Sequence, residues 1–251
     1  MTIQTCTVYH NKTETKLAYV KKEGHLEKPV IVFCGGYRSD MQGTKAMFLE
    51  DYAQKNGYGY IRFDYMGHGQ SEGIFEEGTI GSWAKDTMAI INELTDDKDI
   101  ILVGSSMGGW ISLLCGRELK ERLKGVVGIA AAPDFTRDMM EQFTQGMKSD
   151  LVNKGHVELP NDYSPEPYIV TKALIDDGEK NSMLHAPIEI DCPVTLLQSK
   201  KDSSVPWEKA LKIEEQLTSN NVNVILLEDG DHSLSRPQDL ELLGQAIDKI
   251  G

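Results

Sequence analysis

Short apolar runs alternate along the chain with segments whose apolar residues recur at helical spacing. This alternation is typical of an α/β fold, in which helices cover a mostly parallel sheet. Several of the apolar runs have no polar positions, as strands buried on both faces require. The predicted strands are Val30–Phe33, Tyr58–Phe63, Ile100–Val103, Gly125–Ile129, Val194–Gln198 and Val222–Leu227.

Helical spacing predicts five helices, each with one apolar face that packs on the sheet. They are Thr44–Asn56, Gly81–Leu94, Gly109–Leu119, Trp207–Thr218 and Pro237–Ile250. Ahead of the first buried strand, Cys6–His10 and Lys16–Val20 are expected to form an antiparallel hairpin at the sheet edge, with Asn11, Lys12 and Thr13 in its turn.

One long segment interrupts this rhythm, because more than sixty residues separate Ile129 from Val194. A structureless loop of that length is improbable in a compact domain. We therefore expect a single domain over residues 1–251, with a lid or cap that contains two short helices inserted at residues 134–190. Its apolar side chains could line a substrate pocket or pack the lid on the core, and the sequence leaves both open. They are Met139, Met140, Phe143, Met147, Tyr163, Tyr168 and Met183, of which Met139 and Phe143 are our predicted substrate contacts.

Composition limits the classes of partner. The 251 residues are about 40% hydrophobic, enough for a sizeable core, and carry a formal net charge of −13. An acidic surface repels phosphate backbones and anionic lipids, so we expect no nucleic-acid partner. No apolar run approaches a membrane span, and the N-terminus lacks a secretory signal, which favours a cytoplasmic protein. Monomer and small homo-oligomer both remain open.

The cysteines suggest neither disulfides nor a metal site. Cys6, Cys34, Cys115 and Cys192 lie far apart, and none is spaced with a second cysteine or a histidine as metal ligands are. Cys34 and Cys115 stand within apolar runs. We expect small buried side chains in a reducing compartment, and neither a metal nor an organic cofactor.

The main candidate for chemistry is Ser106. Residues 104–108 have the sequence Gly-Ser-Ser-Met-Gly, directly after a predicted strand and before a predicted helix. A nucleophile on a sharp strand-to-helix turn needs close backbone approach, which glycines two residues either side permit. Ser105 is the rival by adjacency, but only Ser106 has both glycines. The motif alone is weak; in this setting it favours a nucleophilic serine.

A serine nucleophile needs a general base and a group that orients the base. Around such a turn the order along the chain is serine, acid, histidine. His156 and His185 fall in the predicted lid, whereas His232 follows the last strand and is the predicted base. Asp202 follows the preceding strand and is the predicted acid, with Asp134 as its rival.

Two acids adjacent to the base, Asp229 and Asp231, are too near His232 in sequence to orient it and are expected to shape its turn. Two further N–H groups are predicted to bind the oxyanion of an acyl-transfer step. The first is that of Met107, the residue after the nucleophile. The second is that of Tyr37, in the glycine-rich loop after the first buried strand, with Gly36 as the alternative.

The same loop supplies predicted substrate contacts. Gly36 lets backbone approach the substrate, and the Tyr37 ring either walls the pocket or packs in the core. Arg38 could bind a substrate carboxylate, although an ion pair with Asp40 or Asp64 is favoured. His68 lies between glycines of a turn that precedes Ser106, and we interpret it as structural.

Several blocks together are much more specific than the serine motif. Residues 34–46 (CGGYRSDMQGTKA), 64–71 (DYMGHGQS), 78–83 (GTIGSW), 104–110 (GSSMGGW) and 130–135 (AAAPDF) resemble one branch of the α/β hydrolases, the palmitoyl-protein thioesterases and acyl-glucuronide esterases with their bacterial relatives. The resemblance covers nearly the whole chain. It implies an α/β-hydrolase fold, the triad Ser106, Asp202 and His232, and oxyanion donors at Tyr37 and Met107.

Two departures leave these residues untouched. Residues 34–36 are Cys-Gly-Gly where the wider superfamily often has His-Gly, and residues 198–202 lack the glycine that often precedes the acid. The N-terminal residues show no pattern of a mitochondrial targeting segment, so we expect the chain to resemble the bacterial relatives more closely.

The predicted activity is hydrolysis of carboxylic esters or acyl thioesters, on small molecules or acylated proteins, through an acyl-enzyme. A serine aminopeptidase is one alternative and would need acids that hold a substrate amine. Glu166, Asp176, Asp177 and Glu179 are available, although a solvated lid face explains them more simply. A non-catalytic binding protein is another, and the complete serine, acid and histidine set argues against it. Serine in place of aspartate at position 106 excludes a haloalkane dehalogenase.

Overall fold

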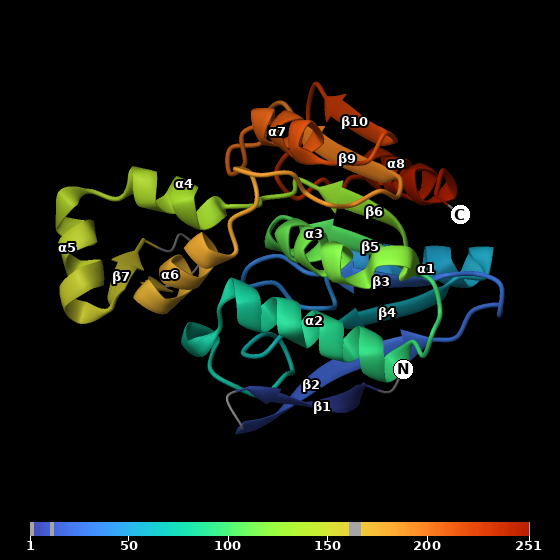
Figure 1. Ribbon diagram of the computed structural model, residues 1–251, viewed down its shortest axis with the longest axis horizontal. Helices are drawn as coiled ribbons and strands as arrows, with labels where there is room; N and C mark the ends of the chain where they lie inside the picture. Colours follow the sequence, from blue (N-terminus) through green and yellow to red (C-terminus); the bar gives the residue numbers. More distant parts are fainter. Residues whose placement is uncertain (1–2, 11–12, 161–166, 251) are drawn as a thin grey trace.

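A single large sheet organises the molecule (Figure 1). The computed structural model describes residues 3–10, 13–160 and 167–250. The strands of the sheet are β1 (Gln4–His10), β2 (Thr13–Lys22), β3 (Val30–Cys34), β4 (Gly59–Phe63), β5 (Ile100–Ser105), β6 (Leu123–Ile129), β9 (Val194–Ser199) and β10 (Val222–Leu227). They lie in the order β1-β2-β4-β3-β5-β6-β9-β10.

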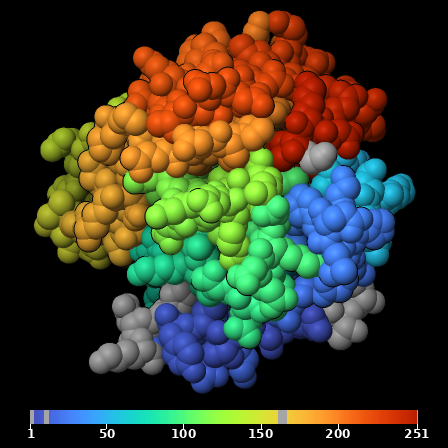
Figure 2. All heavy atoms as spheres, turned by 45° about the vertical axis from the view of Figure 1, so that its right-hand side comes forward, coloured from blue at the N-terminus to red at the C-terminus, as the bar shows by residue number. Residues whose placement is uncertain are grey.

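The pairing confirms a mostly parallel sheet with an antiparallel edge. β1 pairs antiparallel with β2, and β2 antiparallel with β4, whereas every later pair is parallel. Every residue of β3, β5 and β9 is buried, as their apolar runs predict. In Figure 2, N-terminal residues, in blue, lie at one side of the molecule and C-terminal residues, in red, lie at the opposite side. The turn residues Asn11 and Lys12 lie outside the described residues.

Helices cover both faces of the sheet. They are α1 (Thr44–Asn56), α2 (Ile80–Leu94), α3 (Met107–Leu119), α7 (Glu208–Gln216) and α8 (Pro237–Asp248), with short 3₁₀ turns η1 (Phe75–Glu77) and η2 (Lys120–Arg122). Buried side chains of α2, α3 and α7 belong to one hydrophobic cluster, and those of α1 and α8 to a second cluster. No helix in the described part of the chain is long and apolar enough to cross a bilayer.

Local signals in the sequence set several helix ends. α1 ends at Gly57, whose φ of +77° is the left-handed conformation that glycine adopts without strain. α2 begins with a capping box, in which Thr79 Oγ1 accepts from Ser82 N while Ser82 Oγ accepts from Thr79 N. α8 begins at Pro237, a residue favoured in the first helical turn because its fixed φ suits the helix.

The segment between β6 and β9 is a separate, smaller unit that projects from the main body (Figure 1). It contains α4 (Phe135–Gln142), α5 (Gln145–Lys154), the antiparallel hairpin β7 (His156–Leu159) and β8 (Tyr168–Thr171), and α6 (Lys172–Lys180). The expectation of two short helices was therefore wrong. β7 and β8 are only four residues each, and pairing with each other rather than with the main sheet buries Val157 and Val170.

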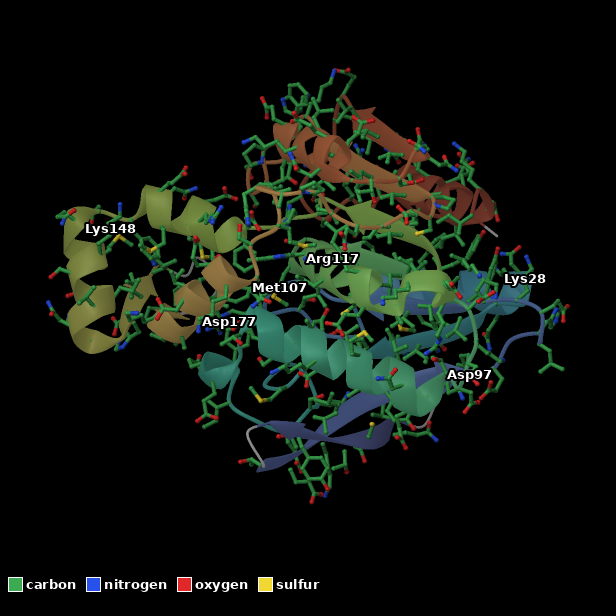
Figure 3. All side chains as sticks on the ribbon, viewed as in Figure 1. Lys28, Asp97, Met107, Arg117, Lys148 and Asp177 are labelled. Carbon is green, nitrogen blue, oxygen red and sulfur yellow. The ribbon has the colours of Figure 1, made fainter. Side chains whose placement is uncertain are left out.

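Both ends of this insertion are joined at its base. The buried Asp134 carboxylate, on the entry side, accepts from Ser182 Oγ at 2.8 Å, Met183 N at 2.8 Å and Leu184 N at 3.0 Å, on the exit side. Trp110 Nε1 of α3 donates to the Asn181 carbonyl at 3.1 Å. In Figure 3, Lys148 marks the end of the insertion that lies farthest from the main body. The base of the insertion therefore lies beside the end of the sheet where α3 begins.

Candidate active site

Ser106 stands on the sharp turn between β5 and α3. Its φ of +54° and ψ of −119° are strained for a residue with a side chain. A Cβ on Gly104 would lie 2.2 Å from the Gly108 carbonyl oxygen, and one on Gly108 would lie 2.0 Å from the Cys34 carbonyl oxygen. The glycines two residues before and after Ser106 are thus required sterically, as the sequence predicts.

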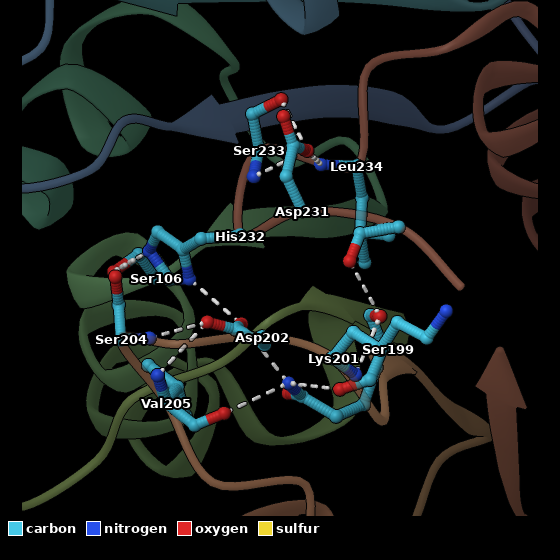
Figure 4. A network of polar contacts seen from close by, with 12 residues as sticks. Ser106, Ser199, Lys201, Asp202, Ser204, Val205, Asp231, His232, Ser233 and Leu234 are labelled. Atoms are coloured by element: carbon cyan, nitrogen blue, oxygen red, sulfur yellow. Dashed lines mark hydrogen bonds and ion pairs between the residues drawn. The ribbon is translucent and has the colours of Figure 1, made fainter. Parts of the chain in front are cut away.

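The structure brings Ser106, His232 and Asp202 into one hydrogen-bonded line (Figure 4). His232 Nδ1 lies 2.8 Å from Asp202 Oδ2, and His232 Nε2 lies 3.1 Å from Ser106 Oγ. When Nδ1–H donates to the carboxylate, Nε2 is left to accept the Ser106 hydroxyl proton. Each side chain comes from a loop at the carboxyl end of a parallel strand, namely β5, β9 and β10, and ligands of open α/β sheets bind at that edge.

The Asp202 side chain is completely buried and receives donors on both oxygens. Oδ1 accepts from the backbone N–H groups of Ser204 at 2.8 Å and Val205 at 2.9 Å. Oδ2 accepts from Gln198 Nε2 at 3.0 Å in addition to His232. Burial alone would raise the pKa of Asp202, but the bonds from His232, Val205 and Ser204 outweigh it and hold that pKa below its usual value. The carboxylate is therefore ionised at neutral pH.

The loop after β3 runs beside the serine. A Cβ on Gly36 would lie 3.6 Å from Ser106 Cβ. The Gly36 N–H already donates to Ser39 Oγ at 3.0 Å, which disfavours it as an oxyanion donor. By contrast, the N–H groups of Tyr37 and Met107 donate to no protein acceptor among the described residues. Tyr37 and Met107 therefore stay the predicted donors, and the alternative at Gly36 is weakened.

A hollow of about 410 Å³ opens next to Ser106, between the loop after β3, the first turn of α1 and the His232 loop. Gly36, Tyr37 and Arg38 line it, together with residues that sequence analysis did not single out, notably Lys45 and Ser233. Met139 and Phe143 do not line this hollow. Phe143, only 6% exposed, belongs to a hydrophobic cluster that includes buried residues of both the insertion and the main body, and Met139 packs against this cluster. Their positions favour packing of the insertion over substrate contact.

Arg38 forms an ion pair, but with a residue that the sequence did not indicate. Its Nη2 donates to Glu76 Oε1 of η1 at 3.2 Å. Its guanidinium also lies over the rings of Phe75, at 4.1 Å, and Tyr168, at 5.1 Å. Pairing with Asp40 or Asp64 was therefore the wrong prediction. Both of those carboxylates accept backbone N–H groups, from Gln42 and from Met41 and Gln70.

The chain is similar to known hydrolases in sequence. The model of the family described as serine aminopeptidase S33 matches residues 26–189, more than half of the chain. The chain belongs to this family. It is also 38% identical, over 93% of its length and 76% of the relative's, to the human protein named palmitoyl-protein thioesterase ABHD10, mitochondrial. The S33 match and the identity to this human protein place the chain among the α/β hydrolases.

Solved structures of the same fold are similar over almost the whole chain. A putative hydrolase from Agrobacterium vitis S4 matches with a TM-score of 0.93 and 42% identity, covering 99% of this chain and 98% of that one. The mouse α/β-hydrolase domain-containing protein 10 matches with a TM-score of 0.88 and 34% identity, covering 98% and 97%. The resemblance drawn from the sequence blocks is confirmed.

Other titratable groups of this S33 hydrolase have structural partners. Asp229 accepts from Arg236, and Asp231 Oδ1 accepts from Ser233 N and Leu234 N, so both shape the His232 loop as expected. Among the described residues, no group of three His, Cys, Asp or Glu side chains is arranged to hold a metal ion. The cysteines are free thiols, and all except the half-buried Cys192 are buried.

Acids proposed to hold a substrate amine in an aminopeptidase are engaged elsewhere. Asp177 Oδ2 accepts from Gly81 N at 2.6 Å and so caps α2, which differs from the solvated face that we expected. Glu179 pairs with Arg137 at 2.6 Å. Asp176 pairs with Lys172. Glu166, like Tyr163, lies outside the described residues.

His68 lies in a buried aromatic cluster and is only 4% exposed. Its ring contacts those of Phe75 and Trp83, with centroids 4.9 and 5.1 Å away, and Nδ1 lies 3.2 Å from the Met66 carbonyl oxygen. Burial lowers its pKa from 6.5 to about 4, so the buried ring is neutral at neutral pH. A structural role, as the sequence suggested, agrees with this position.

His68 should make stability depend on pH. Between pH 6.5 and about 4 the unfolded histidine binds a proton that the folded one does not, so folding is disfavoured as pH falls. Full protonation of the unfolded state would cost up to about 3 kcal/mol. We expect chemical unfolding between pH 7 and 4 to show a steeper loss for the wild type than for His68→Asn. Parallel curves would contradict the neutral buried histidine.

Sequence reasoning missed two polar residues that support Asp202 and the His232 loop. Gln198, the next-to-last residue of β9, donates to Asp202. Ser199 Oγ donates to the Gly230 carbonyl at 2.8 Å, which joins the loops after β9 and β10. A polar pair at the end of a mostly apolar strand was the available signal, because buried polar groups need partners.

Proposed function

We propose that this α/β hydrolase cleaves carboxylic esters or acyl thioesters through an acyl-enzyme on Ser106. The observation that carries the proposal is the contact of His232 with both partners, 3.1 Å from Ser106 Oγ and 2.8 Å from Asp202 Oδ2. Nucleophile, base and orienting acid in this order are what acyl transfer requires. The name of the human relative supports a palmitoyl-type thioester on a protein as one substrate class.

The reaction would proceed in two steps, acylation of Ser106 and hydrolysis of the acyl-enzyme. Ser106 Oγ attacks the acyl carbon while its proton passes to His232 Nε2, and the N–H groups of Tyr37 and Met107 stabilise the oxyanion. The C–O or C–S bond then breaks, and His232 returns the proton to the leaving alcohol or thiol. Water, deprotonated by His232, attacks the acyl carbon, which releases the carboxylic acid and restores Ser106.

The insertion is proposed to act as a lid over the acyl chain. The Phe135 ring of α4 lies 5.8 Å from the Tyr37 ring, and the Tyr168 ring of β8 lies 5.1 Å from the Arg38 guanidinium. Both contacts join the insertion to the loop that carries the proposed oxyanion donor.

Cytoplasmic localisation and a monomeric or small homo-oligomeric state stay predictions.

Covalent labelling with a fluorophosphonate probe tests the proposal. Attack of an activated serine on phosphorus expels fluoride, so intact mass should rise by one adduct, which peptide mapping should locate on Ser106 rather than Ser105. Turnover of p-nitrophenyl esters, and of acyl thioesters of matched chain length, then gives the preferred leaving atom and acyl length.

Two results would redirect the assignment. Turnover of aminoacyl p-nitroanilides well above that of the esters would favour the aminopeptidase alternative. A wild-type protein with neither adduct nor turnover would contradict the proposal and favour a non-catalytic binding protein.

A further inference from the structure

The loop that carries His232 is held by bonds within it and by one bond from β9. It follows β10 and contains two residues with positive φ, Gly230 at +134° and Leu234 at +44°. Asp231 stabilises the turn from within, and Ser199 holds the Gly230 carbonyl from β9. On the side away from β9, the carbonyl of Ser233, directly after the base, faces α1. A partner there would hold the backbone one residue after His232.

Lys45 of α1 is that partner. It lies 188 residues before Ser233 in the chain, and its Nζ donates to the Ser233 carbonyl and, at 3.3 Å, to Ser235 Oγ. Lys45, Ser106, His232 and Ser233 also line the same hollow. Among the described residues of α1, only Lys45 donates a charged hydrogen bond to the loop. The helix therefore reaches the His232 loop through one ammonium group.

The surroundings of Lys45 suit a fixed rather than a solvated ammonium. Burial lowers the pKa of Lys45, whereas the charges of Asp231 and Asp239 act in the opposite direction. Lys45 is half-buried, and its bonds to the Ser233 carbonyl and to Ser235 Oγ replace part of the hydration that the ammonium loses there. These two bonds tie the segment after His232 to α1.

We propose that Lys45 is a positioning residue for the acyl transfer, which fixes the Ser233 carbonyl and so places His232 Nε2 against Ser106 Oγ. The inference rests on the proposed function. The base lies at hydrogen-bond distance from the nucleophile, and a displacement of about 1 Å at such a contact can cost about 100-fold in rate. Lys45 touches neither reacting atom, so it acts through the loop.

Two variants separate the position from the charge. Lys45→Met has a similar length but no donor, and we expect kcat for p-nitrophenyl acetate to fall about 10- to 100-fold with little change in KM. Lys45→Arg keeps a charged donor and should recover a large part of that loss. The rate of fluorophosphonate labelling should fall in parallel with kcat, because it also needs the activated serine.

Arg122→Met is the matched control. Arg122 is likewise a cation bonded to backbone carbonyls, those of Lys98 and Asp96, in loops at the amino end of the parallel strands. Its removal should lower the melting temperature without lowering kcat. If Lys45→Met reduced only the melting temperature, as Arg122→Met should, a positioning role would be wrong. A raised KM at unchanged kcat would likewise overturn it in favour of substrate contact.

A measurement without turnover separates this inference from the proposed function. The proton between His232 Nδ1 and Asp202 should give a low-field NMR resonance in the wild type, assigned by its loss in His232→Gln. A shifted or broadened resonance in Lys45→Met, restored in Lys45→Arg, supports positioning even if the wild type has no hydrolase activity. If Lys45→Met changed neither the resonance nor kcat, the positioning role of Lys45 would be wrong, and the proposed function would be unaffected.

Discussion

Ser106→Ala is expected to lower kcat by about 10⁴- to 10⁶-fold, because no other side chain in the line can form the acyl-enzyme. The loss should exceed that of any other single substitution considered for this protein. Alanine has no hydroxyl but keeps a Cβ, so the strained backbone at φ +54° has the same steric demands. We expect the variant to be folded, which an unchanged melting temperature would show. The loss of kcat is measured with p-nitrophenyl esters.

Ser105→Ala is the matched control for this experiment. Ser105 is the last residue of β5 and is buried, so its removal tests the neighbouring hydroxyl in the same turn. We expect this variant to retain both turnover and the fluorophosphonate adduct. Loss of the adduct in Ser105→Ala but not in Ser106→Ala would transfer the nucleophile to the rival position.

Much of the fold could be predicted because its strands carry a strong signal. A strand buried on both faces, such as β3 or β5, is apolar throughout, and a helix that packs one face on a sheet shows helical spacing. The range of α1 agrees with the prediction at both ends, since Gly57 ends it in the left-handed conformation.

The insertion was less predictable because its elements are short. β7 and β8 bury few side chains, so four-residue runs carry little periodic signal, and their pairing with each other depends on tertiary context. Likewise, Arg38 has several acids nearby in sequence, and only the fold brings it to Glu76 of η1. The charge of Arg38 does not indicate which acidic side chain it pairs with, because their distances in space depend on the fold.

The three residues in the hydrogen-bonded line could be proposed from sequence because motif and chain order restrict them. Each follows a predicted strand, and parallel strands end at one edge of the sheet. Residues that support them, such as Gln198 and Lys45, belong to no motif. Lys45 meets the His232 loop across 188 residues, and no local pattern encodes such a contact.

Asp202→Asn is expected to lower kcat by about 10⁴-fold with KM little changed, because the amide would fix the wrong imidazole tautomer. Oδ1 of Asp202 accepts two backbone N–H groups, so the amide oxygen must take that position. The amide NH₂ then faces His232 Nδ1 and donates to it. Nε2 would carry the proton and could not accept one from Ser106, and kcat measured with p-nitrophenyl esters should report this loss.

Asp134→Asn distinguishes the two acids that the sequence offered. Asp134 accepts three hydrogen bonds from the exit side of the insertion, so an amide there should lower the melting temperature. It makes no contact with His232 among the described residues, and kcat should therefore stay near the wild-type value. If Asp134→Asn instead lost turnover while Asp202→Asn kept it, the orienting acid would come from the β6 loop. Stability loss at Asp134 and rate loss at Asp202 would together separate the group that holds the insertion from the group that orients the base.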